Sequence, residues 1–119
     1  MARWWKENSS QVAAAIDAAE KTSGHQIIVW VGNLGRRPAH VADKIAVKYA
    51  AASLVFCVDP HHRTFEMRWA DGLDVDSQRI VNAARGGLRD HDLARAVTDV
   101  AAVLPRRTEG EELPDIVEE

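Results

Sequence analysis

Two stretches of the chain are apolar at every position, and a third alternates between apolar and polar residues. The continuous runs are Ile27–Val31 and Leu54–Val58, and both are rich in β-branched and aromatic side chains. Runs of this kind are typical of strands that are covered on both faces of a sheet. From Thr64 to Ala70 the apolar residues stand at every second position, which predicts a strand with one exposed face.

Four further segments carry apolar residues at helical spacing, every three or four positions. They are Ser9 to about Lys21, Pro38 to about Ala51, a helix capped by Asp74 or Asp76, and a helix capped by Asp90 or Asp92. Aspartate is a favoured cap because its carboxylate accepts hydrogen bonds from the free amides of the first turn. Gly86 and Gly87 stand inside the third helix, and we expect them to weaken or end it.

The order of these elements predicts the architecture. Strand, helix and strand make a βαβ unit with parallel strands, and the short turn before Thr64 makes the third strand antiparallel. We therefore expect an α/β fold, a three-layer α/β/α sandwich around a small mixed sheet of three to four strands. The 119 residues fit a single domain, with residues 1–8 as an N-terminal extension and 106–119 as an irregular charged tail.

Charge and composition exclude several classes of function. The net charge of −3 gives no electrostatic footprint for nucleic acid. The longest apolar run, Leu54–Val58, is far shorter than the roughly 20 residues of a membrane span. The single cysteine, Cys57, excludes an internal disulfide framework and a cysteine-based zinc cluster. The first residues lack the apolar core of a secretion signal. We expect a soluble, cytoplasmic protein that is a monomer or a weak dimer.

Several local strings follow one another in the order found in a known family. They are Ala18–Gly24 before the first apolar run, Leu54–Met67 with its Pro60–Arg63 turn, Trp69–Leu73, and Glu112–Asp115. Together they span about residues 10–116 and resemble the TPM domain family, which includes thylakoid-lumen, bacterial and nematode membrane-associated proteins. The chain is most similar to the family's stand-alone soluble branch, as a divergent member. The resemblance implies the same fold class and says little about activity.

The chain departs from the family's pattern at three places. Ala50–Ser53 stands where members usually carry Asn-Gly, His25 where the soluble branch often has Glu, and Trp69-Ala70 where Gly-Asp precedes a second glycine. Some relatives are described as acid phosphatases or divalent-cation binders. Because this chain has fewer polar groups at the matching positions, we expect a TPM-like domain without efficient catalysis of its own.

Asp71, Asp74 and Asp76 form a carboxylate-rich loop after the third strand. Calcium and magnesium take several oxygen ligands, which closely spaced aspartates can supply. We therefore regard these three residues as a candidate metal site, where a bound ion could assist phosphate-ester hydrolysis. The alternative is structural: Asp71 and Gly72 form a turn, and Asp74 or Asp76 caps the next helix.

A second candidate lies at the carboxyl ends of the two parallel strands, where ligands of open α/β sheets tend to bind. It comprises Asn33, Asp59, His61 and His62. Aspartate and histidine can ligate zinc, but adjacent histidines in a tight turn rarely point at one ion, so a solvated hairpin turn is the alternative. The remaining histidines are expected at the surface or at helix caps: His25, His40 and His91.

Trp4 and Trp5 either cover the edge of the core or face a partner protein. The polar-faced strand Thr64–Ala70 is a candidate sheet edge for strand addition. A solvated face is expected for Arg85, Arg89 and Arg95. We predict a non-catalytic binding module for an unidentified partner protein or a weakly held divalent cation. The alternative is a metal-dependent, acid-phosphatase-like hydrolase acting at the Asp71–Asp76 loop.

Overall fold

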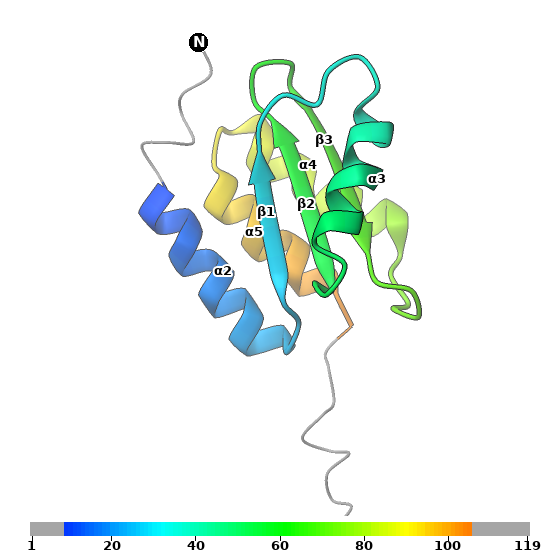
Figure 1. Cartoon of the computed structure of the whole chain (residues 1–119). Helices are drawn as coiled ribbons and strands as arrows, with labels where there is room; N and C mark the ends of the chain where they lie inside the picture. Colours follow the sequence, from blue (N-terminus) through cyan, green and yellow to red (C-terminus); the bar gives the residue numbers. More distant parts are fainter. Residues whose placement is uncertain (1–8, 106–119) are drawn as a thin grey trace, which may run out of the picture.

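The computed structural model describes residues 9–105 and places a three-stranded sheet at the centre of the fold. The strands are β1 (Ile27–Val31), β2 (Leu54–Asp59) and β3 (Thr64–Trp69), in the order β1-β2-β3 (Figure 1). β2 is parallel to β1 and antiparallel to β3, as the sequence predicts. The predicted N-terminal extension, with Trp4 and Trp5, and the predicted tail 106–119 lie outside the described residues.

Helices cover both faces of this sheet (Figure 1). α3 (Pro38–Lys48) packs on one face, against β2 and β3. The other layer contains α2 (Ser9–Ser23), α4 (Ser77–Arg89) and α5 (Leu93–Val103), and α5 packs against both of the other two helices. The three-layer α/β fold is therefore confirmed, and within residues 9–105 its mixed sheet has three strands.

The central strand β2 divides the core into two clusters. All six of its residues are buried, and successive side chains point to opposite faces of the sheet. Leu54, Phe56 and Val58 pack into the larger cluster with α2, α4 and α5. Val55 and Cys57 pack into the smaller cluster beneath α3. Burial on both faces explains why the sequence of this strand has no polar alternation.

The end of α3 differs from the prediction. The helix ends at Lys48 rather than near Ala51. The amide of Ala52 donates to the carbonyl of Tyr49 at 2.9 Å, which closes a turn and brings Ala52 into the smaller cluster. Residues 50–52 are alanines, which favour helical backbone. The chain nevertheless leaves the helix before them, and this turn allows Ala52 to be buried ahead of β2.

Gly86 and Gly87 do not end the third helix, contrary to one of the two predicted effects, because α4 continues through both to Arg89. A Cβ atom at Gly87 would lie 2.5 Å from the backbone nitrogen of Ala96 in α5. The missing side chain lets the two helices approach closely, so Gly87 serves packing rather than termination. A Cβ atom at Gly86 would meet only the end of the Arg95 side chain, at 3.2 Å.

The predicted aspartate caps are present at one of each pair of alternatives. Asp76 accepts hydrogen bonds from the amides of Gln78 and Arg79 at the start of α4. Asp92 accepts one from the amide of Arg95 at the start of α5. These bonds satisfy amides that have no partner within the helix.

Candidate functional site

The carboxyl ends of β1 and β2 meet at Asp59, the last residue of β2. This side chain is only 1 % exposed. Its oxygens accept hydrogen bonds from the Leu34 amide at 2.9 Å, the His62 amide at 3.0 Å and the His62 Nδ1 at 2.8 Å. We call Asp59, His62 and the Leu34 amide the Asp59 cluster. It joins the loop after β1 to the turn between β2 and β3.

The surroundings of Asp59 favour its ionised form. Burial acts to raise the pKa of this carboxyl, but the hydrogen bonds from the Leu34 amide and from the amide and ring of His62, together with the charge of that ring, outweigh it. The pKa of Asp59 therefore lies below its ordinary value. An ionised carboxylate can only accept hydrogen bonds, so all three neighbours donate to it.

The structure brings together only part of the second predicted site. Asp59 and His62 are in contact, whereas Asn33 accepts a hydrogen bond from the Gly35 amide and so closes its own turn. The ring of His61 packs against the ring of His62 edge to face, with centroids 4.8 Å apart. Within residues 9–105, no group of three or more histidine, cysteine, aspartate or glutamate side chains is placed to hold a metal ion.

The carboxylates after β3 form no metal-binding group either within residues 9–105. Asp71, Asp74 and Asp76 are all exposed, and they are not gathered into a cluster that could hold a metal ion. Asp76 instead caps α4. The structural interpretation of this residue therefore applies, and the metal site at Asp71, Asp74 and Asp76 stays a prediction without a donor cluster to support it.

His25 is not at the surface, contrary to the prediction, but only 5 % exposed. Its Nε2 lies 2.6 Å from the carbonyl oxygen of Pro105, and its Nδ1 lies 3.2 Å from Oγ of Ser53. A carbonyl only accepts, so Nε2–H donates to it, and in the neutral ring Nδ1 then accepts from the Ser53 hydroxyl. His25 thus fixes the end of the described chain beside the start of β2.

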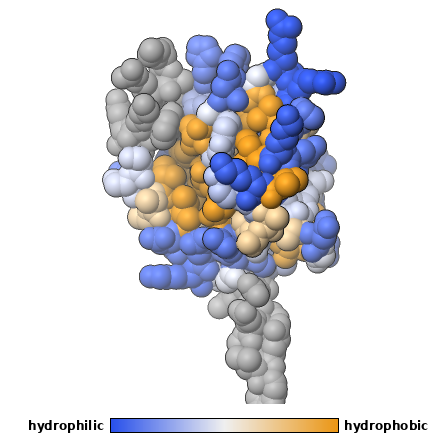
Figure 2. Space-filling view, viewed as in Figure 1, coloured by the Kyte–Doolittle hydropathy of each residue, from blue (hydrophilic) through white to orange (hydrophobic). Residues whose placement is uncertain are grey.

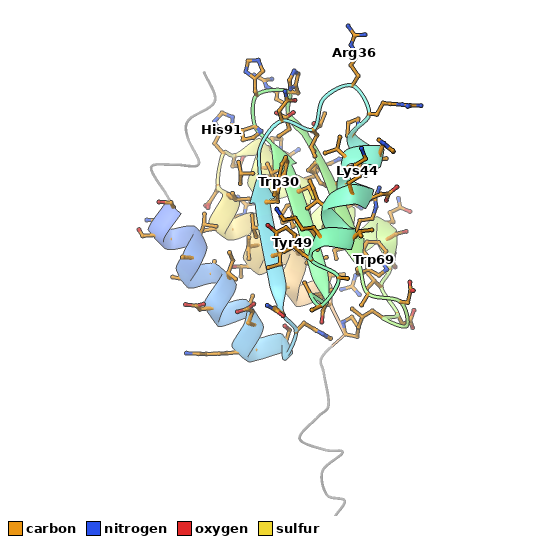
Figure 3. The ribbon with its side chains drawn as sticks, viewed as in Figure 1. Trp30, Arg36, Lys44, Tyr49, Trp69 and His91 are labelled. Carbon is orange, nitrogen blue, oxygen red and sulfur yellow. The ribbon has the colours of Figure 1, made fainter. Side chains whose placement is uncertain are left out.

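A cavity runs along β3, and we call it the β3 groove. It has a volume of about 970 Å³. Its walls come from the whole length of β3 and from one side of α4, including Val81, Arg85, Leu88 and Arg89. Trp69 and His91, which are labelled in Figure 3, both line it, and in that view they lie at the lower right and the upper left of the fold.

One edge of β3 faces this groove, because β3 is the last strand in the sheet order. The Ala70 amide donates to the Ser53 carbonyl on β2's side. Successive residues of an antiparallel strand alternate between bonding inward and outward. The backbone groups of Ala70 point toward β2, so those of Thr64, Glu66 and Arg68 also point toward β2. The backbone N–H and C=O groups of the other three residues point away from β2: Phe65, Met67 and Trp69.

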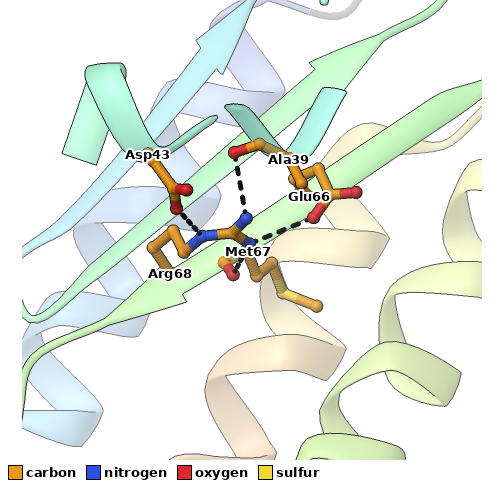
Figure 4. Close-up of polar contacts among 5 residues, drawn as sticks. All are labelled: Ala39, Asp43, Glu66, Met67 and Arg68. Atoms are coloured by element: carbon orange, nitrogen blue, oxygen red, sulfur yellow. Dashed lines mark hydrogen bonds and ion pairs between the residues drawn. The ribbon is translucent and has the colours of Figure 1, made fainter. Parts of the chain in front are cut away.

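Arg68 covers part of this free edge (Figure 4). Its guanidinium donates to Asp43 at 2.7 Å, to Glu66 at 3.0 Å, and to the carbonyl oxygens of Met67 and Ala39 at 2.8 and 3.1 Å. Its bond to the Met67 carbonyl agrees with the outward direction of that group. The same side chain ties β3 to the first two turns of α3.

Positive charge in the groove lacks matching negative charge. Arg63, Arg85 and Arg89 line it, are exposed, and make no ion pair with another residue in the range 9–105. Of the two groove carboxylates, Asp59 is bonded to His62 and Glu66 to Arg68. In addition, Oγ1 of Thr64 is a buried polar atom without a hydrogen-bond partner in the described part of the chain.

The other edge of the sheet is apolar. Four of the five residues of β1 are partly exposed, and Val47 on α3 is 78 % exposed. Figure 2 shows apolar side chains on this face, bordered by polar ones.

Cys57 lies on the central strand β2, where burial raises the pKa of its thiol to about 11. This side chain therefore stays protonated and unreactive near neutral pH.

Comparisons with known proteins identify a fold and no family. No family model matches the chain. No curated protein matches it either. The chain is similar to the NMR structure of the BA42 protein from the psychrophilic bacterium Bizionia argentinensis, with a TM-score of 0.57 and 16 % sequence identity over 97 % of this chain and 88 % of that one. At this identity the likeness shows the fold alone.

None of the helices within residues 9–105 has the length and apolar character needed to cross a bilayer.

Sequence reasoning missed the groove residues on α4. Arg85 and Arg89 were assigned with Arg95 to one solvated face, but only the first two line the groove. Arg95 instead pairs with Asp90 and Asp99. A signal was present, since Arg85 and Arg89 are four residues apart and therefore share a face of the helix. The sequence does not say that this face borders the free edge of a strand.

Proposed function

We propose that the protein is a non-catalytic binding module that takes up an extended segment of a partner protein as a fourth strand on β3. The observation that carries this proposal is the free edge of β3, where the outward backbone groups of Phe65, Met67 and Trp69 border a groove of about 970 Å³. An unpaired strand edge is a template for pairing with another chain. Strand addition uses such main-chain groups for affinity and neighbouring pockets for specificity.

The walls of the groove suit an added strand. Its side chains would alternate between two faces. On the α4 side they would meet Val81 and Leu88, and on the other side they would meet Glu66 and Arg68. The buried hydroxyl of Thr64, which has no partner among residues 9–105, offers a further hydrogen bond to an occupant. We assign the chain to the TPM family as part of the same proposal, on the strings named above.

A peptide selection followed by hydrogen exchange tests this function. Random peptides would be selected on the immobilised full-length protein, and amide exchange would then be measured by NMR with and without a selected peptide. Strand addition should slow exchange of the outward amides of Phe65, Met67 and Trp69. The inward amides of Thr64, Glu66 and Arg68 already bond to β2 and should change less.

A matched pair of substitutions controls for nonspecific binding. Val81→Glu puts a carboxylate into the groove, whereas Val47→Glu makes the same change on the exposed face of α3. Val81→Glu should abolish peptide binding and Val47→Glu should leave it unchanged. Peptides that bind both variants equally, or that leave exchange at Phe65, Met67 and Trp69 unaltered, would refute the function.

The cation-binding and phosphatase alternatives at Asp71–Asp76 remain predictions. An amide NMR titration with calcium, magnesium and zinc, each reversed by a chelator, tests the first. Localised shifts at Asp71, Asp74 and Asp76 would support it and justify a phosphoester assay of the Asp74→Asn variant. Shifts at His61 and His62 would move the site to the Asp59 cluster. No shift at millimolar metal would count against both alternatives.

A further inference from the structure

We propose that the acidic segment 109–119 of the same molecule occupies the β3 groove and that a partner segment has to displace it. This inference rests on the proposed function, because it assigns an occupant to the same free edge. Three independent features of the chain carry it: the distribution of charge along the sequence, the unpaired arginines of the groove, and the position at which the described chain ends.

Charge is strongly segregated along the sequence. Residues 109–119 contain six acidic side chains and no basic one, whereas residues 1–108 contain 15 basic and 12 acidic side chains. The net charge of −3 is therefore the difference between an excess of three positive charges in the first part and six negative charges in the segment. The segment also carries three apolar residues: Leu113, Ile116 and Val117.

The groove has the complementary composition. Arg63, Arg85 and Arg89 supply positive charge that no carboxylate within residues 9–105 neutralises. Val81 and Leu88 supply apolar surface to the wall of the same groove. In a strand that contains acidic and apolar residues, the acidic side chains could pair with the arginines and the apolar ones could pack against Val81 and Leu88. Complementary charge also selects against neutral and basic segments.

The described chain ends close to one end of the groove. Pro105 is bonded through His25 to Ser53, as described above. The Ser53 carbonyl in turn accepts a hydrogen bond from the amide of Ala70, the residue that follows β3, at 2.9 Å. Pro105 is therefore fixed at the same end of the sheet as Trp69, which lines the groove.

The length of the segment is sufficient to follow β3. Four extended residues span about 14 Å, and neighbouring strands are about 4.8 Å apart. Residues 106–109 can therefore reach from Pro105 to the edge of β3. From there the segment would run from Trp69 toward Thr64, antiparallel to β3, whose six residues are about 20 Å long. Pro114 is compatible with this position, because an outermost strand tolerates a missing amide that faces solvent.

Paramagnetic relaxation measured by NMR on the full chain tests the proposal. A nitroxide would be attached to the variant Val117→Cys; the native Cys57 is fully buried and should not react. Amide signals of residues 65–69 and 85–89 should lose most of their intensity relative to the reduced label. The intensity should return at about 1 M salt, where the Debye length is about 3 Å.

Two double variants that each remove two positive charges provide a matched comparison. In the spin-labelled chain, Arg85→Gln with Arg89→Gln should restore the signals of residues 65–69. Arg36→Gln with Arg37→Gln removes the same charge from exposed residues outside the groove and should leave the signal loss intact. Signal loss that persists in the groove variant, or no loss in the parent chain, would overturn the proposal.

Mixed samples separate an intramolecular occupant from a second copy. Nitrogen-15-labelled chain without a nitroxide would be mixed with unlabelled chain that carries it. Signal loss in this mixture would show that the segment comes from another molecule and would overturn the proposal as stated. If the nitroxide shows no docking but selected peptides still bind β3, only this inference fails. If docking occurs and no peptide can displace the segment, the proposed function fails instead.

Discussion

The side chain of Asp59 joins two loops that the sheet leaves unconnected. The sequence places an aspartate at the end of a buried strand, and the general position of ligand sites in α/β sheets made it a candidate. Its partners could not be predicted. They depend on the register that sets Val31 beside Val58, and the apolar pattern of two continuous runs does not fix a register. His61 and His62 are adjacent, so only one of them reaches Asp59.

Removing this carboxylate should destabilise the protein. Asp59→Ala leaves the amides of Leu34 and His62 without their acceptor, and we expect a loss of about 3 kcal/mol in the free energy of unfolding. Asp74→Ala removes the same group from an exposed position and should change this free energy by less than about 0.5 kcal/mol. Urea unfolding curves of the two variants measure the difference, and equal midpoints would contradict the role of Asp59.

Asp59 should also contribute to the pH dependence of stability. Its pKa is lowered in the folded protein, so the folded state binds a proton less readily than the unfolded state, whose aspartates titrate near 3.9. The contribution is fully present above that value and is lost as the pH falls through the lower, folded pKa. Asp59→Asn should therefore show a shallower loss of unfolding free energy between about pH 5 and pH 2 than the native chain.

The matched variant Asp74→Asn controls for the general effect of acid on that slope. Its unfolding free energy should fall with pH as steeply as that of the native chain. If the unfolding free energy of Asp59→Asn falls with decreasing pH as steeply as that of the native chain and of Asp74→Asn, the hydrogen bonds to Asp59 do not favour its ionised form.

Among the elements, the strands could be predicted more closely than the packing of the helices. Runs of apolar residues and turn residues define β1, β2 and β3 almost to the residue. The limits of α3 and the continuation of α4 depend on contacts between elements instead. Gly87 illustrates this, because glycine is locally unfavourable in a helix and is explained only by the backbone of Ala96 beside it.

Two neighbouring glycines of α4 should respond in opposite ways to the same substitution. Gly87→Ala places a methyl group 2.5 Å from the Ala96 nitrogen, and overpacking of this kind should lower the unfolding free energy by about 1 to 3 kcal/mol. Gly86→Ala meets only the far end of the long Arg95 side chain and should raise the unfolding free energy by about 0.5 to 1 kcal/mol through helix propensity. Thermal unfolding of both variants gives the sign, and a Gly87→Ala variant as stable as the native chain would contradict the close approach of α4 and α5.

For the whole molecule, the layer order could be predicted and the groove could not. Alternating strand and helix patterns with one antiparallel turn permit few arrangements. The groove lies between β3 and one side of α4, and no local sequence pattern specifies how these two elements are spaced. The charge segregation between residues 1–108 and 109–119 can be read from the sequence, but its meaning depends on where Arg85 and Arg89 lie.

The central strand has a consequence for how this protein can change over time. Both edges of β2 are paired and both of its faces are covered, so every lateral connection within the described sheet passes through six residues. Because all six residues of β2 are buried, a larger or polar side chain introduced there cannot reach solvent. A saturation mutagenesis scan read out by folding should find β2 the least permissive segment of the described sheet. Within residues 9–105, the outer strands β1 and β3 each have one edge without a paired strand and can therefore vary more than β2.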